Sequence, residues 1–394
     1  MRHDRLAIRN RRQFLRFLAG SPLLAPLASA QQTPPLASAK DALSVMDFAE
    51  PAHQALPPAH WGYLATGVDD NATLEANLAG FKRIQLRPRR LVDVSKPDLK
   101  TELFGTVWDS PLFLCPVGYQ RAFHPQGEVA VARAAETTRS LQILSTVTST
   151  PVEEVAKARG TAPWYQLYIP STWAATEKLV RRVEAAGCPV LVWTVDLLGG
   201  RNAETGERFR RTDTRDCTLC HTSARGGVRN RPMLDGIESG YNPPNATWEF
   251  VDRLKKLTRM KLVLKGIETR EDARLCREHG VDAIVVSNHG GRATEDLRPT
   301  IDSLPEVVDG VGGQIPVLVD GGFRRGTDIY KALASGARAA GIGRPYIYGL
   351  AAFGQEGVER VVEILRAELT MVMKQCGSPS INQITPASIA RRQQ

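Results

Sequence analysis

Short and almost continuously apolar runs recur along the chain from residue 111 onward, and amphipathic segments lie between them. Runs of this length without alternation are typical of parallel strands that are buried on both faces. They begin at residues 111, 141, 164, 189, 261, 282, 315 and 339. The spacing predicts helices over 173–187, 247–259, 269–279 and 354–375. Eight alternating units in one domain predict an α/β fold of the (β/α)8 TIM barrel type.

Polar residues follow the apolar runs directly. The carboxyl ends of the strands of a TIM barrel meet on one face, where active sites are built. We therefore expect one site to contain Ser145, Gln166, Tyr168, Thr194, Asp196, Lys265, Ser287, His289, Asp320, Gly321, Gly322, Gly343 and Arg344.

The sixth run ends in the sequence SNHGGR, which places His289 and Arg292 at this face. A histidine beside arginines, with Asp196 on another strand end, suits proton abstraction from an anionic substrate. The carboxylate would hold the imidazolium, and the arginines would hold the anion. A core histidine satisfied by backbone groups is the alternative reading.

The seventh and eighth runs end in DGGFRRG and GIGRP. Their glycine amides, an arginine and a helix that begins near Gly326 predict a phosphate site, as barrels commonly have at this position. Lys265 would point into the same mouth, where it could stabilise an anionic reduced ring or form a Schiff base. No Rossmann or P-loop signature is present, which argues against those nucleotide sites.

The first thirty residues have the features of an export signal. Arg11 and Arg12 precede a short apolar run that ends in Ala28-Ser29-Ala30. This order predicts a twin-arginine signal over 1–30 and a periplasmic protein. Residues 31–45 then read as a proline-containing linker, and residues 46–394 as the barrel domain.

Charge and hydropathy exclude two classes of partner. Without the signal the chain has 45 basic and 41 acidic residues, a net charge of +4 that does not call for nucleic acid. No later stretch is long and apolar enough for a transmembrane span, so none is expected in the mature chain.

A polar insertion is expected after the fourth strand, over 201–246, as a long loop without secondary structure. Residues 201–235 hold eight arginines and five acids, which argues against membrane insertion. Cys217, Cys220 and His221 form the C-x-x-C-H pattern of haem c attachment, with Met233 as a candidate distal ligand. A local disulfide, two exposed thiols, or zinc held between subunits are the alternatives.

With these motifs, residues 45–390 resemble the FMN-dependent 2-hydroxy acid oxidases and dehydrogenases, which include glycolate oxidase, lactate oxidase and mandelate dehydrogenase. The resemblance makes His289 the base and Arg292 the group that binds the substrate carboxylate. The segment GYLATG brings a substrate-contacting Tyr63, and YQLY brings the active-site Tyr168. Asp196 would orient the histidine and strengthen it as a base, and Arg201 would be a second carboxylate ligand.

The same resemblance assigns the cofactor. The ring of FMN would lie along the backbone of Pro116, Val117 and Gly118, with Lys265 at its N1 and O2 edge. The remaining FMN contacts implied are Ser145, Gln166, Thr194, Ser287, Asp320, Gly321, Gly322, Arg324, Gly343 and Arg344.

Two departures bear on function. Glycolate oxidase has alanine where Gly118 stands and tryptophan where Val147 stands, so a roomier pocket is expected. The segments PVG and LSTV are more similar to the respiratory L-lactate and mandelate dehydrogenases, which favours an acceptor other than oxygen.

The resemblance thus implies oxidation of a lactate-like L-2-hydroxy acid to the 2-oxo acid, with electrons passed to a cytochrome or quinone, by a homotetramer. An oxidase that reduces oxygen to hydrogen peroxide is the nearest alternative. A Schiff-base aldolase that uses Lys265 and a catalytically inactive binding protein are alternatives from other classes.

Overall fold

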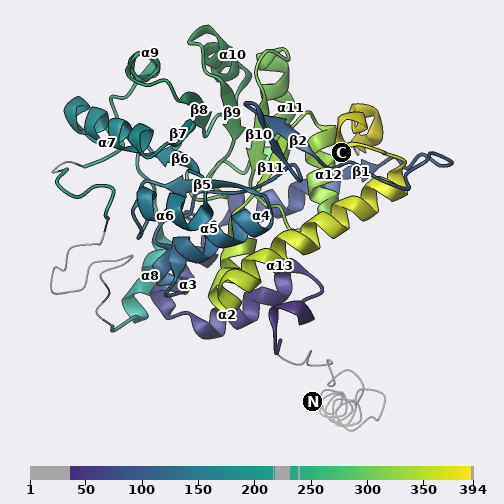
Figure 1. The fold of residues 1–394 in the computed structure, drawn as a ribbon, viewed down its shortest axis with the longest axis horizontal. Coiled ribbons are helices and arrows are strands. Elements are labelled where there is room, and N and C mark those ends of the chain that lie inside the picture. Colours follow the sequence, from purple (N-terminus) through teal and green to yellow (C-terminus); the bar gives the residue numbers. More distant parts are fainter. Residues whose placement is uncertain (1–35, 216, 218–230, 238–239, 392–394) are drawn as a thin grey trace, which may run out of the picture. The chain divides into compact units, whose positions relative to one another are not determined.

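Eight parallel strands close into a barrel, as the sequence pattern predicts (Figure 1). Around the barrel the order is β10-β11-β4-β5-β6-β7-β8-β9, so strands follow one another in sequence order and the last pairs with the first. The strands are β4 (Leu112–Leu114), β5 (Leu141–Ser145), β6 (Trp164–Leu167), β7 (Val190–Thr194), β8 (Lys261–Lys265), β9 (Ala283–Val286), β10 (Val317–Asp320) and β11 (Ala339–Ile342). The prediction of a TIM barrel is confirmed.

The computed structural model describes residues 36–215, 217, 231–237 and 240–391. The barrel belongs to a unit that begins at Ser38. The predicted export signal, and Cys220 and His221 of the C-x-x-C-H pattern, lie outside the described residues.

The barrel interior is packed at the end where the strands begin. Phe113, Val192, Val263 and Leu318 are completely buried in one cluster. A two-stranded hairpin, β2 (Thr101–Leu103) with β3 (Thr106–Trp108), adds Leu103 to it. The hairpin was not predicted. It covers the amino-terminal end of the barrel and leaves the carboxyl end of the strands for the site.

Helices alternate with the strands (Figure 1). They are α5 (Gly127–Thr137), α6 (Val152–Arg159), α7 (Trp173–Ala185), α9 (Trp248–Leu257), α10 (Arg270–Glu278), α11 (Thr300–Val311), α12 (Gly326–Ala334) and α13 (Arg344–Cys376). The predicted helices 173–187, 247–259 and 269–279 match α7, α9 and α10. The helix expected over 354–375 is the second part of α13, whose backbone breaks at Phe353 and Gly354.

Segments outside the barrel repeat pack against it. Before the barrel, the described residues form α2 (Ala49–Ala55), α3 (Pro58–Ala65) and α4 (Ala72–Gly80), and β1 (Ile84–Leu86) pairs with β12 (Ile389–Arg391). The linker expected over 31–45 is shorter in the structure, because Ala39, Ala42 and Val45 are buried. Small apolar side chains of this segment are part of the folded unit from Ser38 onward.

The insertion after β7 is not structureless, which corrects the expectation for 201–246. It contains α8 (Glu204–Thr212), which packs against α3. A Cβ atom at Gly62 would lie 2.4 Å from the Cβ of Phe209, so the two helices approach closely only because residue 62 is glycine. The outer surface of α8 carries ion pairs such as Arg208 with Glu204. Among the described residues, no helix is long and apolar enough to cross a membrane.

Candidate active site

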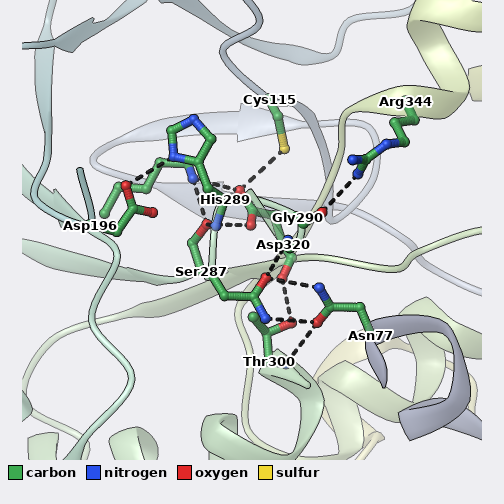
Figure 2. Close-up of polar contacts among 12 residues, drawn as sticks. Asn77, Cys115, Asp196, Ser287, His289, Gly290, Thr300, Asp320 and Arg344 are labelled. Carbon is green, nitrogen blue, oxygen red and sulfur yellow. Dashed lines mark hydrogen bonds and ion pairs between the residues drawn. The ribbon is translucent and has the colours of Figure 1, made fainter. Parts of the chain in front are cut away.

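His289 lies between a carboxylate and a phenol, and Figure 2 shows its contact with the carboxylate of Asp196. Its Nδ1 atom is 2.9 Å from Oδ1 of Asp196, which follows β7, and its Nε2 atom is 3.3 Å from the hydroxyl of Tyr168, which follows β6. His289 has a φ of 59°, and its backbone N–H donates to Oγ of Ser287 at 3.1 Å. A bulky residue in this left-handed region is uncommon and is typical of functional sites.

Electrostatics leave this histidine neutral. Burial is the largest influence on the pKa of His289 and lowers it below the ordinary value of 6.5, although Asp196 opposes the shift. Asp196 favours the imidazolium, as expected, but burial has the larger effect on the pKa. For Asp196, burial is the largest influence and raises the pKa, but His289, Lys265 and Arg201 together outweigh it, and the pKa is lowered. Burial raises the pKa of Tyr168 well above 10.0, so its hydroxyl keeps its proton.

The arginines expected to bind a carboxylate lie together beside this dyad. Arg292 donates from Nη1 to the backbone oxygens of Tyr63 and Thr66, and its guanidinium is 4.6 Å from the Tyr63 ring centroid. Arg201 donates to the backbone oxygen of Arg292 at 3.4 Å. Burial lowers the pKa of Arg292 to about 10, which still leaves it charged at neutral pH. The side chains proposed for catalysis and substrate binding therefore surround one space.

Lys265 forms a buried ion pair below this space. Its Nζ atom is 3.0 Å from Oδ2 of Asp320, and Ser287 donates to the other carboxylate oxygen at 2.6 Å. Burial would lower the pKa of Lys265, but the charges of Asp320 and Asp196 outweigh it and the pKa is raised. A nucleophilic amine must lose its proton, so this pairing disfavours the Schiff-base alternative.

A cavity of about 780 Å³ extends from His289 across the carboxyl ends of the strands. Most residues assigned to FMN line it: Pro116, Val117, Gln166, Thr194, Lys265, Asp320, Gly321, Gly322, Arg324, Gly343 and Arg344. Ser145 lies behind them and donates to Oε1 of Gln166 at 3.0 Å.

Polar groups in this cavity fit the cofactor. Nε2 of Gln166, Oγ1 of Thr194 and Nε of Arg324 are buried and have no hydrogen-bond partner among the described residues. Buried polar groups in native proteins normally have partners, so these groups are suited to a polar ligand. At the amino terminus of α12 the N–H of Gly326 donates to Oε2 of Glu368 at 2.7 Å, so the phosphate donor expected near Gly326 is not confirmed. The residues present therefore fit FMN.

Gly322 shows how closely the backbone approaches here. It has a φ of 83°, and a Cβ atom would lie 2.3 Å from the backbone oxygen of Asn77. Arg344 lines the cavity, but its guanidinium donates to the backbone oxygens of Leu64, Gly290 and Thr66. In the structure this arginine ties the amino-terminal helices to the turn that carries His289.

Sequence reasoning missed the side chains that hold this turn (Figure 2). Asn288 exchanges hydrogen bonds with Asn77 of α4 and accepts the backbone N–H of Gly291. Thr300 donates to the backbone oxygen of Asp320 at 2.5 Å. Asn288 stands directly beside His289 in the sequence, which was a usable signal, whereas Asn77 lies in a segment without a motif.

The pocket at Gly118 is tighter than expected. A Cβ atom there would lie 2.5 Å from Cγ2 of Val147. The valine fills the space that the missing methyl leaves, so Gly118 does not enlarge the pocket.

The haem pattern gains no support from its described residues. The Sγ atom of Cys217 is buried, 3.3 Å from Nε2 of His60. Met233, the suggested distal ligand, is 1% exposed, and its sulfur accepts the backbone N–H of Val152 at 3.4 Å. Met233 is therefore a packed core residue.

This combination of barrel, buried lysine and histidine dyad defines a flavin-dependent oxidoreductase. The FMN-dependent dehydrogenase family matches residues 52–391, and the chain belongs to this family. The resemblance noted in the sequence is thus confirmed.

Relatives include both oxidases and dehydrogenases. The chain is 40% identical over 349 residues to peroxisomal (S)-2-hydroxy-acid oxidase GLO4 of Oryza sativa subsp. japonica, covering 88% of this chain and 95% of the relative. It is 34% identical to L-lactate dehydrogenase (cytochrome) of Wickerhamomyces anomalus, and the match covers 92% of this chain and 63% of the relative. Among solved structures, a soluble mutant of the membrane-associated (S)-mandelate dehydrogenase of Pseudomonas putida matches with a TM-score of 0.82 and 31% identity. The match covers 89% of this chain and 100% of that chain.

Proposed function

We propose that the protein oxidises an L-2-hydroxy acid to the 2-oxo acid with FMN and passes the electrons to a cytochrome or a quinone. The observation that carries this proposal is that His289, which is hydrogen-bonded to Asp196, lines one space together with Arg292 and Arg201. Relatives named for 2-hydroxy acids support the substrate class.

Different side chains of the site bind the substrate and transfer its proton. Arg292 and Arg201 bind the substrate carboxylate, which fixes the carbon that bears the hydroxyl group near His289. Nε2 of His289 accepts a proton, while Asp196 holds the Nδ1 proton and stabilises the imidazolium that forms. The hydroxyl of Tyr168, which keeps its own proton, can donate a hydrogen bond to a substrate bound beside Nε2 of His289. FMN, when bound, would take up the two electrons and the second hydrogen that leave the substrate.

Lactate is the simplest substrate with which to test this. FMN-loaded protein is mixed with L-lactate without oxygen, and the flavin absorbance is followed. Bleaching supports the proposal, and a flavin that keeps its colour with every 2-hydroxy acid tried refutes it. Re-oxidation by air with release of hydrogen peroxide, as fast as by cytochrome c or a soluble quinone, would favour the oxidase alternative.

We propose no electron transfer through haem. A haem attached at Cys217 and Cys220 would give sharp reduced bands in the same experiment, and their appearance would change this part of the proposal. The expected oligomer is a homotetramer, which light scattering of the purified protein tests.

The site of action is a separate proposal, namely export to the periplasm. Its basis is the pair Arg11 and Arg12 before the apolar run. Replacing both with lysine is expected to leave the protein in the cytoplasm, as measured by cell fractionation. Unchanged periplasmic yield would contradict the proposal.

A further inference from the structure

A second and larger space lies on the other side of His289. It has a volume of about 1420 Å³ and shares Tyr63, Tyr168, His289 and Arg292 with the cofactor cavity. Glu207 and Arg210 belong to its polar lining, and its apolar wall consists of Tyr119, Val147, Leu197 and Tyr241. These pack in one cluster with Tyr63 and Tyr168. A substrate held by Arg292 would extend its side chain toward this wall.

Tyr119 is held in an unfavourable backbone conformation. Its φ is 56°, and its backbone N–H donates to the oxygen of Val147 at 3.0 Å. Its side chain is almost completely buried, and its ring meets that of Tyr63 edge to face with centroids 6.2 Å apart. Residues kept in such conformations cluster at functional sites, because the surrounding structure must compensate for the strain.

Tyr241 comes from the insertion and is fixed against the segment that follows β6. Asn242 donates its backbone N–H to the oxygen of Ile169 at 2.7 Å, and Tyr241 forms a β-bridge with Pro170. The ring of Tyr241 stacks on that of Tyr168 with centroids 5.7 Å apart and an interplanar angle of 20°. The insertion thus adds an aromatic ring directly beside the catalytic phenol.

Arg231 joins the two unassigned tyrosines. Its Nε atom donates to the hydroxyl of Tyr119 at 3.0 Å, and its guanidinium lies 5.2 Å from the ring centroid of Tyr241 and 5.9 Å from that of Tyr119. The next residue, Pro232, accepts a hydrogen bond from Arg182 of α7 at 2.8 Å. No carboxylate in the described part of the chain lies within ion-pair distance of Arg231. The guanidinium therefore braces the rings by cation–π contact.

We propose that Tyr119, Tyr241 and Arg231 form a side-chain subsite that selects L-2-hydroxy acids with an aromatic side chain. The inference rests on the proposed function and names its substrate class. The methyl group of lactate would leave most of this wall uncovered. An aromatic ring would cover apolar surface and meet several rings at once, which adds favourable ring contacts to area burial.

Binding of acids that lack the hydroxyl group tests the subsite without oxidation. The FMN-loaded protein is titrated by calorimetry with 3-phenylpropionate and with propionate. We expect 3-phenylpropionate to bind at least about tenfold more tightly, as apolar pockets commonly discriminate side chains of different size. Equal affinities would overturn the proposal. Tighter binding of glutarate than of 3-phenylpropionate would also overturn it, because Arg231 would then serve a second carboxylate.

Three variants locate the effect. Tyr241→Leu and Arg231→Met are each expected to reduce the preference for 3-phenylpropionate by about two- to tenfold. Arg253→Met is the matched control, because Arg253 makes the same kind of contact with Trp173, at 3.7 Å from the ring centroid, on α7. A preference retained in both subsite variants, or lost equally in the control, would overturn the proposal.

Flavin reduction separates this proposal from the one on which it rests. Anaerobic reduction is compared for L-3-phenyllactate and L-lactate, with kcat/KM expected to favour the aromatic acid by about tenfold or more. If neither acid reduces FMN while 3-phenylpropionate still binds preferentially, the proposed function fails and the subsite stands. If lactate is the faster substrate and the analogues bind equally, the function stands and the subsite fails.

Discussion

Nζ of Lys265 lies 3.0 Å from Oδ2 of Asp320, and both side chains are almost completely buried, at 5% and 7% exposed. The pair joins the end of β8 to the end of β10 beneath the cofactor cavity. Two charges out of water depend on each other, since removing one leaves the other without compensation.

Lys265→Met is therefore expected to lower the free energy of unfolding by about 3–5 kcal/mol, because Asp320 stays buried and unpaired. It should also weaken FMN binding, since Lys265 lines the cavity. Urea unfolding and FMN release on dilution measure these effects. The control is Lys261→Met on the same strand, whose partner is Asp282 and whose side chain is 53% exposed, so that only about 0–1 kcal/mol is expected. Equal losses in both variants would contradict the assigned role of the buried pair.

Replacing the base should separate binding from chemistry. His289→Ala is expected to retain FMN but to reduce the rate of flavin reduction by L-lactate by about 10²–10⁴-fold. The reason is that the variant lacks the Nε2 atom that accepts the substrate proton. The measurement is anaerobic stopped-flow absorbance. His279→Ala is the control. The Nδ1 atom of His279 also pairs with a carboxylate, at 2.8 Å from Oδ1 of Asp252, but His279 lies at the carboxyl end of the outer helix α10. Bleaching at the wild-type rate would remove His289 as the base.

The pH dependence follows from the lowered pKa of His289. The histidine accepts a proton only when neutral, and it is neutral above its pKa. Since burial lowers that pKa below 6.5, kcat/KM should be constant through neutral pH and fall only at a pH below 6.5. If the decrease of kcat/KM on the acid side of the pH profile, its acid limb, began above pH 6.5, the lowered pKa of His289 would be contradicted.

Asp196→Asn should move the same limb. Asp196 raises the pKa of His289, so its removal lowers that pKa further and shifts the acid limb to lower pH. The rate should also drop by about 10²–10⁴-fold, because the imidazolium loses its partner. A variant with reduced rate but an unmoved limb would show that Asp196 acts only by holding the ring in place. The two parameters are read from one series of pH-dependent rates.

The barrel and its catalytic face could be predicted because both depend on local patterns. Each buried strand is a continuous apolar run, and each catalytic side chain follows such a run within a few residues, as His289 follows β9. The contacts that support the site could not be predicted in this way. Asn77 and Tyr241 come from segments without strand periodicity, and their places are set by tertiary packing against Asn288 and Tyr168. The effect of Asp196 on the pKa of His289 could be predicted from the sequence, but the larger effect of burial could not, because the sequence does not show how deeply the histidine lies.

Glu128 of α5 ties together two loops of the site. Its carboxylate is completely buried and accepts hydrogen bonds from the backbone of Gln120 and from the backbone and hydroxyl of Ser149. Thr150 donates to its second oxygen at 3.0 Å. Gln120 follows the loop along which the flavin ring is expected, and Ser149 follows Val147 of the substrate pocket.

Glu128→Ala should therefore destabilise the protein and disturb both loops. Several donors would be left buried without a partner, at about 1–3 kcal/mol each, so we expect a loss of at least about 3 kcal/mol in the free energy of unfolding. The matched control, Glu136→Ala, changes an exposed glutamate on the same helix and should stay within about 0.5 kcal/mol of the wild type. Urea unfolding measures both. If Glu128→Ala is as stable as the control, the carboxylate does not hold the loops, and their positions must come from apolar packing alone.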